Sequence, residues 1–239
     1  MSNSRALVIK SIKQGETSSI VSCYLEEIGF KSFLVKGLYG QKKSRFSKAH
    51  FFPLNIININ YSFNEMRSLG FIKEVKSEFL FNTIHTDIQK SSVIVFLSEI
   101  LNSVFKEELE VNQDLFNFLL NSLLWYDNIK ECNNFHIKFL IELSKYIGFH
   151  PNIKNKEDMY FCLESGSTSN TKPLAGNIEG EDLNLFKELL GTKFEDLNTI
   201  SIKRESRTRI LNKIIDYYSL HLQMFKTPKS IHVFAEVFK

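Results

Sequence analysis

Short runs of alternating apolar and polar residues fill the first 77 positions of the chain, a period of two that is typical of β-strands. Turn residues, chiefly Gly, Asn and acids, separate the runs. Pro53 precedes one run, where it can open a strand without removing a hydrogen bond from the sheet. Five short strands in so few residues predict a small barrel or sandwich. The expected strands are residues 5–13, 20–25, 32–36, 54–61 and 69–75.

From residue 83 onward the apolar period lengthens to about 3.6 residues, which predicts helices. Ser206 is expected to cap the last long helix. Residues 150–178 break the helical pattern and predict an irregular excursion with at most a short hairpin near residues 160–163. The expected helices are residues 93–105, 112–126, 133–147, 180–190 and 206–225, followed by a short one from Ser230.

The chain is therefore predicted to be an α+β protein with a five-stranded barrel over residues 1–78 and a helical domain over residues 79–239. The two parts differ in charge. The first 77 residues hold 12 Lys and Arg against five Asp and Glu, a balance of +7, whereas the whole 239-residue chain carries only +3. A basic front half on a mildly acidic back half suggests a polyanionic partner for the barrel.

A basic loop follows the third expected strand. Gly37 and Gly40 permit the positive φ that its turns require. Such a loop can bind the phosphates of a nucleic acid without recognising the base sequence. The alternative is a hairpin loop that is solvated and binds nothing. We expect backbone contacts from Lys36, Lys42, Lys43, Arg45 and Lys48, with Arg5 and Lys10 as supporting charges.

The aromatic residues around the loop divide into two groups. Tyr39 and Phe46 have polar or charged neighbours, so we expect them to stack on bases. Phe33, Phe51 and Phe52 are expected to fill the barrel instead.

A second basic segment lies in the last long helix. Its candidate residues would extend a nucleic-acid track or hold the tail of a protein partner. They are Arg204, Arg207, Arg209 and Lys213.

Catalytic and metal motifs are missing from the sequence. The six His residues show no metal-ligand spacing, and there is no P-loop, nucleophile elbow or dinucleotide fingerprint. The three Cys residues are odd in number and far apart, which favours reduced thiols in the cytoplasm. The N-terminus has no apolar signal region, and the longest uncharged run is too short to cross a bilayer. We expect no enzyme activity, no metal and no cofactor.

The order of these parts resembles the recombination mediator RecO family. The resemblance is carried by Gly15-Glu16 in the first turn, Val35-Lys36-Gly37 before the basic loop, Leu69-Gly70 at the last strand, and the C-terminal residues Arg207, Arg209, Tyr217-Tyr218, His221 and Lys229-Ser230. It covers essentially the whole chain through many weak signals.

The resemblance implies an N-terminal OB-fold, a helical C-terminal domain and a DNA repair role at the nucleoid in the cytoplasm. It implies binding of single- and double-stranded DNA, annealing of complementary strands and, with RecR, loading of the RecA recombinase. It also implies docking of the C-terminal tail of single-strand-binding protein on the helical domain.

One feature departs from the family. Many members carry four zinc-binding Cys residues in the helical half, but the corresponding excursion here has only Cys162, so we predict no structural zinc. Two alternatives remain open. An OB-fold RNA-binding protein would depend on 2′-hydroxyls, and a protein-binding adaptor would show no DNA binding at low salt. A metal-free hydrolase is a more distant third.

Overall fold

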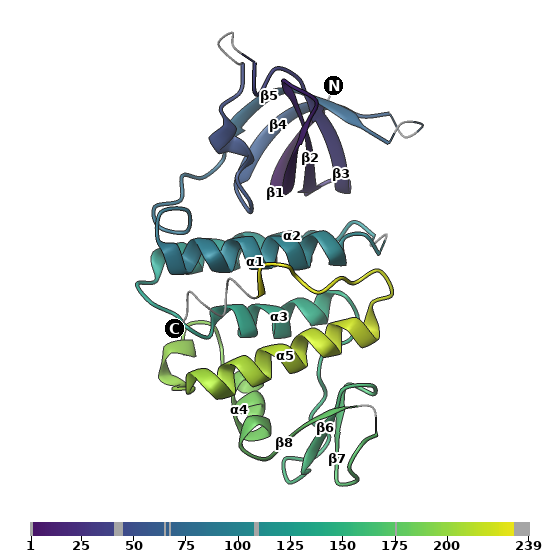
Figure 1. Ribbon diagram of the computed structural model, residues 1–239, viewed down its shortest axis with the longest axis vertical. Coiled ribbons are helices and arrows are strands. Elements are labelled where there is room, and N and C mark those ends of the chain that lie inside the picture. The colour runs from purple at the N-terminus through teal and green to yellow at the C-terminus, as the bar shows by residue number, and fades with distance from the viewer. Residues whose placement is uncertain are drawn as a thin grey trace. The chain divides into compact units, whose positions relative to one another are not determined.

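The computed structural model describes residues 2–40, 45–64, 66, 68–107, 110–174 and 176–231. These residues form two compact units, whose elements are labelled in Figure 1. The first unit extends to Asn128 and includes Pro228–Ser230, and the second extends from Ile129 to Thr227. Among the described helices, none is long and apolar enough to cross a membrane.

The first unit begins with a closed five-stranded barrel. Its strands follow the order β1-β2-β3-β5-β4, and β4 pairs with β1 to close the ring. Every pairing is antiparallel except that of β3 with β5. The predicted α+β class with an N-terminal OB-fold barrel is thereby confirmed. The strands are β1 (Ser2–Gln14), β2 (Ser18–Leu25), β3 (Gly29–Val35), β4 (Ile56–Ser62) and β5 (Gly70–Ser77), with a 3₁₀ helix η1 (Lys48–Phe51) between β3 and β4.

The barrel is buried on part of its outer face as well as inside. Val8 and Ile57 belong to the interior core, as alternation along a strand requires. Their neighbours Leu7 and Ile56, which face outward, are also no more than 2% exposed. Helix α1 (Ile88–Val104) packs on β1 and covers part of this outer wall. This explains why the fourth predicted strand is apolar on both faces.

Tyr24 joins the barrel to the two helices that follow it. Its ring stacks on Phe105, which caps α1, with centroids 4.4 Å apart, and on Phe116 in α2 (Gln113–Asn128), with centroids 6.4 Å apart. The hydroxyl of Tyr24 donates to the backbone carbonyl of Asn112 at 3.4 Å. These contacts place α1 and α2 in the same compact unit as the barrel.

Asp127, near the end of α2, organises the turn that precedes α1. Its carboxylate accepts the backbone N–H groups of Asn82, Thr83 and Ile84 at 2.7–3.0 Å. The ammonium group of the buried Lys90 donates to the Thr83 hydroxyl (2.7 Å) and to the Asp127 carbonyl (3.1 Å). Burial alone would raise the pKa of Asp127, but these backbone N–H groups outweigh burial and lower it.

We expect Asp127→Asn to lower the free energy of unfolding by about 1–3 kcal/mol at neutral pH, because buried N–H groups lose a charged acceptor. A carboxylate with a lowered pKa contributes stability above its unfolded pKa, which is lost as pH falls through the folded value. The deficit should therefore shrink as pH falls below about 4. Urea unfolding of both proteins across that range measures it, and a deficit independent of pH would contradict this assignment.

The described part of the second unit contains the α-helices α3, α4 and α5, which contact one another, and a small sheet. The sheet has the order β7-β6-β8. The elements are α3 (Phe135–Tyr146), β6 (Tyr160–Cys162), β7 (Ser167–Ser169), β8 (Asn177–Glu179), α4 (Gly180–Gly191), η2 (Leu197–Thr199) and α5 (Arg204–His221).

Two details of the last helix differ from the expectation. Helix α5 begins at Arg204, so Ser206 is not the N-cap but a buried residue whose hydroxyl accepts from Arg209. The helix ends at His221 rather than Phe225, because Leu222 adopts an extended conformation. The expected helix from Ser230 lies largely outside the described residues.

The excursion at residues 150–178 forms the hairpin β6–β7, as expected, and also most of a third strand, β8, which the sequence pattern missed. Aromatic packing holds it, since Phe161 lies 5.0 Å from Phe186 and 5.6 Å from Tyr217 between ring centroids. His221 also hydrogen-bonds the Leu163 carbonyl at 2.9 Å. Nowhere in the described chain do three His, Cys, Asp or Glu side chains gather as metal ligands.

Candidate nucleic-acid interface

Cations on the barrel surface lie over aromatic rings. Lys36, just after β3, is exposed, and its Nζ lies 5.6 Å from the centroid of the Phe71 ring. Lys48, the first residue of η1, lies 4.7 Å from the Tyr39 ring, and Lys13 lies 5.6 Å from the same ring. Such pairs combine positive charge with an apolar face. Of the other loop cations, Lys42 and Lys43 lie outside the described residues.

Four residues of this surface were missed by the sequence interpretation: Lys13, Lys31, Phe63 and Phe71. The Lys31 ammonium lies 5.6 Å from the Phe63 ring. Phe71 is paired in register with Leu34 across the parallel β3–β5 contact, which explains why Lys36 reaches it. Only the strand order could have revealed this neighbour of Lys36, because β3 and β5 are adjacent in the closed barrel and not in the sequence.

Arg5 does not supply a free surface charge, contrary to the expectation. Its guanidinium makes a two-pronged ion pair with Glu26 at 2.6 and 2.7 Å and lies over the Phe116 ring. Gln113 donates to the same carboxylate at 2.6 Å. The hydrogen bond from Arg5 lowers the pKa of Glu26. Arg5 therefore braces β1 against the start of α2, whereas Lys10 in the same strand is exposed.

Arg45 remains available for a ligand. It pairs with Glu74 at 3.4 Å, but both side chains are more than 60% exposed. An exposed pair of this kind is worth less than about 1 kcal/mol, so a phosphate can replace the carboxylate.

The exposure of Phe46 and Phe52 is the reverse of what the sequence predicted. Phe46 is 9% exposed and packs in the barrel core 6.3 Å from the Phe51 ring, so its ring is not displayed for stacking. Phe52 is 48% exposed rather than buried. Phe33 and Phe51 fill the barrel as expected. The local polarity of the sequence misled the interpretation, because packing in the barrel core and not the neighbours in sequence decides which ring is buried.

The second basic segment is not a single surface. At 3.6 residues per turn, Arg204 and Arg207 share one side of α5, and Arg209 and Lys213 share another. Arg209 makes a two-pronged ion pair with Asp182 at 2.7 and 2.8 Å. Burial, with the nearby charge of Arg204, lowers the pKa of Arg207. The segment is therefore divided and partly neutralised, which its linear sequence did not indicate.

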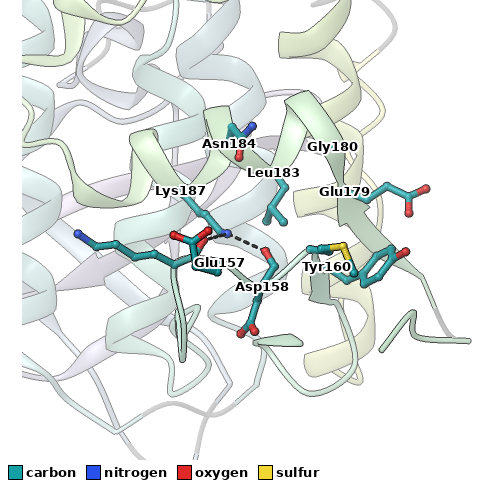
Figure 2. Close-up of a pocket in the computed structure, with 10 residues that line it drawn as sticks. Glu157, Asp158, Tyr160, Glu179, Gly180, Leu183, Asn184 and Lys187 are labelled. Atoms are coloured by element: carbon teal, nitrogen blue, oxygen red, sulfur yellow. Dashed lines mark hydrogen bonds between the residues drawn. The ribbon is translucent and has the colours of Figure 1, made fainter. Parts of the chain in front are cut away.

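A pocket of about 480 Å³ lies in the second unit, between the start of α4 and the residues that lead into β6. Figure 2 shows Lys187 reaching across it, where its ammonium donates to the carbonyls of Lys156 (2.6 Å) and Asp158 (2.8 Å). The ten residues that line it include no Ser, Thr, Cys or His. Lys187 therefore holds the backbone together, and the one hydroxyl among the lining side chains is the phenol of Tyr160.

The barrel surface has the chemistry of a single-strand binding surface. Cations neutralise phosphates, and accessible rings accept stacked bases without reading sequence. Phe71 is exposed, whereas Tyr39 and Phe63 are partly buried against the barrel core. The face of strands 2 and 3 and the loops between strands 1 and 2 and between strands 4 and 5 are where OB-folds commonly bind oligonucleotides. Lys31 belongs to β3, Lys13 lies at the end of β1 before the first of these loops, and Phe63 begins the second.

Two family models match consecutive parts of the chain. Residues 1–81 match the family model "Recombination protein O N terminal", and residues 85–230 match "Recombination protein O C terminal". The chain is 40% identical over 234 residues to "DNA repair protein RecO" of Flavobacterium psychrophilum and 38% identical to that of Flavobacterium johnsoniae, with 98% of each chain covered. The protein of the same name from Phocaeicola vulgatus is 33% identical over 97% of both chains. The chain therefore belongs to the RecO family of DNA repair proteins.

Proposed function

We propose that this protein is a non-enzymatic recombination mediator that binds single- and double-stranded DNA and anneals complementary strands. With RecR it would help load the RecA recombinase onto DNA coated with single-strand-binding protein. The observation that carries the proposal is the set of cation–aromatic pairs on the barrel: Lys36 with Phe71, Lys31 with Phe63, and Lys13 and Lys48 with Tyr39.

Annealing is first a problem of charge. Two strands repel each other until cations replace their counterions. The bases of each strand must also be kept unstacked before they can pair with the other strand. A lysine over a ring supplies both functions at one place, because the ammonium contacts a phosphate while the ring accepts a base. Neither function requires a reacting group on the protein.

The helical unit is proposed to receive the acidic, apolar tail of single-strand-binding protein. The candidate cations are those of α5, Arg204, Arg207, Arg209 and Lys213, of which Arg209 pairs with Asp182. Such a tail needs cations beside an apolar surface. Leu220 is a half-exposed apolar residue of α5 on the side of Arg209 and Lys213.

A strand-annealing assay tests the proposal. We expect the protein to accelerate pairing of complementary oligonucleotides, and to do so on strands coated with single-strand-binding protein only when that protein keeps its C-terminal tail. Acceleration on bare strands that is lost with the tail-deleted coat would support both parts. No acceleration on bare strands at low salt would contradict the DNA-binding assignment.

A further inference from the structure

The conformation of the turn around Phe52 leaves its side chain exposed to solvent. Its side chain is 48% exposed, whereas Phe51 is 3% exposed and Leu54 is fully buried. Leu54 has a φ of 58°, a left-handed conformation that is unusual for a residue with a bulky side chain. A backbone of this kind persists only where its surroundings fix it.

Hydrogen bonds supply that constraint. The backbone N–H of Leu54 donates to the Val8 carbonyl at 2.7 Å, and the Val8 N–H donates to the Asn55 carbonyl at 2.9 Å. The Asn55 side-chain amide donates to the Ala49 carbonyl at 2.6 Å. The turn is thus tied to β1 and to η1, and Phe52 is left facing solvent.

Two further rings support Phe52. The His85 ring lies 5.8 Å from it between centroids in a tilted arrangement, and Phe81 meets His85 edge to face at 5.9 Å. His85 is held in place by a hydrogen bond between its Nε2 and Asn55 Oδ1 at 2.7 Å. The three rings form a row of Phe81, His85 and Phe52, and Phe52, at its outer end, is the exposed ring.

The charges around the row favour an anionic ligand. Lys48 begins η1, and Phe52 follows its end, about 8 Å along a helix that rises about 2 Å per residue. Lys10 is exposed in β1, two residues beyond the point where the turn is tied to that strand. The carboxylate of Asp87, two residues after His85, is occupied as the cap of α1 by the Lys90 N–H at 2.9 Å.

A rigidly supported aromatic ring beside phosphate-binding cations suits a base better than a protein side chain. We infer that Phe52, backed by His85 and Phe81, is a stacking platform for one unpaired base of a single-stranded nucleic acid. This inference rests on the proposed function and adds a second stacking position, at the opposite end of η1 from Tyr39.

Two oligonucleotides separate stacking from charge: one of thymidines, and one of the same length with an abasic backbone. We expect Phe52→Leu, which keeps an apolar side chain, to weaken binding of the thymidine strand about fivefold or more and to leave the abasic strand unchanged. Phe52→Trp should retain the wild-type affinity for the thymidine strand and change its fluorescence on binding. Val95→Ala, an exposed apolar residue of α1, is the matched control and should change neither affinity.

Fluorescence anisotropy at low salt measures these affinities, with thermal unfolding as the check on folding. Equal weakening of both strands by Phe52→Leu, or no weakening of either, would overturn the platform while leaving DNA binding intact. Loss of a protein partner in place of DNA affinity would likewise overturn it. If the unmodified protein bound neither strand, the proposed function itself would fail.

Discussion

Replacing Lys13, Lys36 and Lys48 together by Glu is expected to weaken binding of single-stranded DNA about tenfold or more. These lysines lie over Tyr39 and Phe71, where phosphate contacts and stacked bases would meet. Each lost phosphate contact removes about 0.7 from the slope of log affinity against log salt concentration. Three lost contacts should therefore flatten the slope by about 2. Titrations at several salt concentrations measure both quantities.

A matched variant separates position from charge. Lys106, Lys130 and Lys145 are exposed lysines outside the barrel, and their replacement by Glu changes the net charge by the same amount. We expect that variant to keep most of the affinity and the original salt slope. If both triple variants lost affinity equally, the effect would come from net charge alone and the barrel surface would not be the binding site.

Tyr24→Ala is expected to lower the free energy of unfolding by about 3–5 kcal/mol, the usual cost of deleting a buried aromatic side chain. Tyr24 is 1% exposed and touches both Phe105 and Phe116, so the cavity would lie where the barrel meets the two helices. Urea unfolding monitored by circular dichroism gives the value.

The conservative variant Tyr24→Phe keeps the ring and removes only the two hydrogen bonds between the Tyr24 hydroxyl and the Asn112 backbone. It should cost about 1–2 kcal/mol, the net worth of two such hydrogen bonds. A loss below about 1 kcal/mol for Tyr24→Ala would show that the barrel is stable without the helices against its outer wall, contrary to the packing.

Local patterns identified most of the elements. The alternation around Val8 and Ile57 marked strands, and the 3.6-residue period marked the helices, because burial on one side of an element repeats with its geometry. The boundaries moved where local signals were weak. Ser206 has good capping chemistry, but the backbone enters the helix two residues earlier.

The candidate site was only partly predictable. Lys36, Lys48 and Tyr39 stand in a visibly basic stretch, and the structure places each on the barrel surface or at its edge. Phe71 was not predictable, because its neighbour Lys36 is distant in sequence and meets it only through the β3–β5 pairing. The sequence predicted Arg5 to be a free cation, but in the structure Arg5 is paired with Glu26.

The sequence by itself determined the classes of element, the basic character of the front half and the resemblance to a family, since all three depend on residue type and short-range spacing. The tertiary structure decided which charges are free and which rings are exposed. Phe46 and Phe52 show the reason. Phe46 has polar and charged neighbours in the sequence and packs in the barrel core, whereas Phe52 has apolar neighbours and is left facing solvent by the turn held by Val8, Leu54 and Asn55.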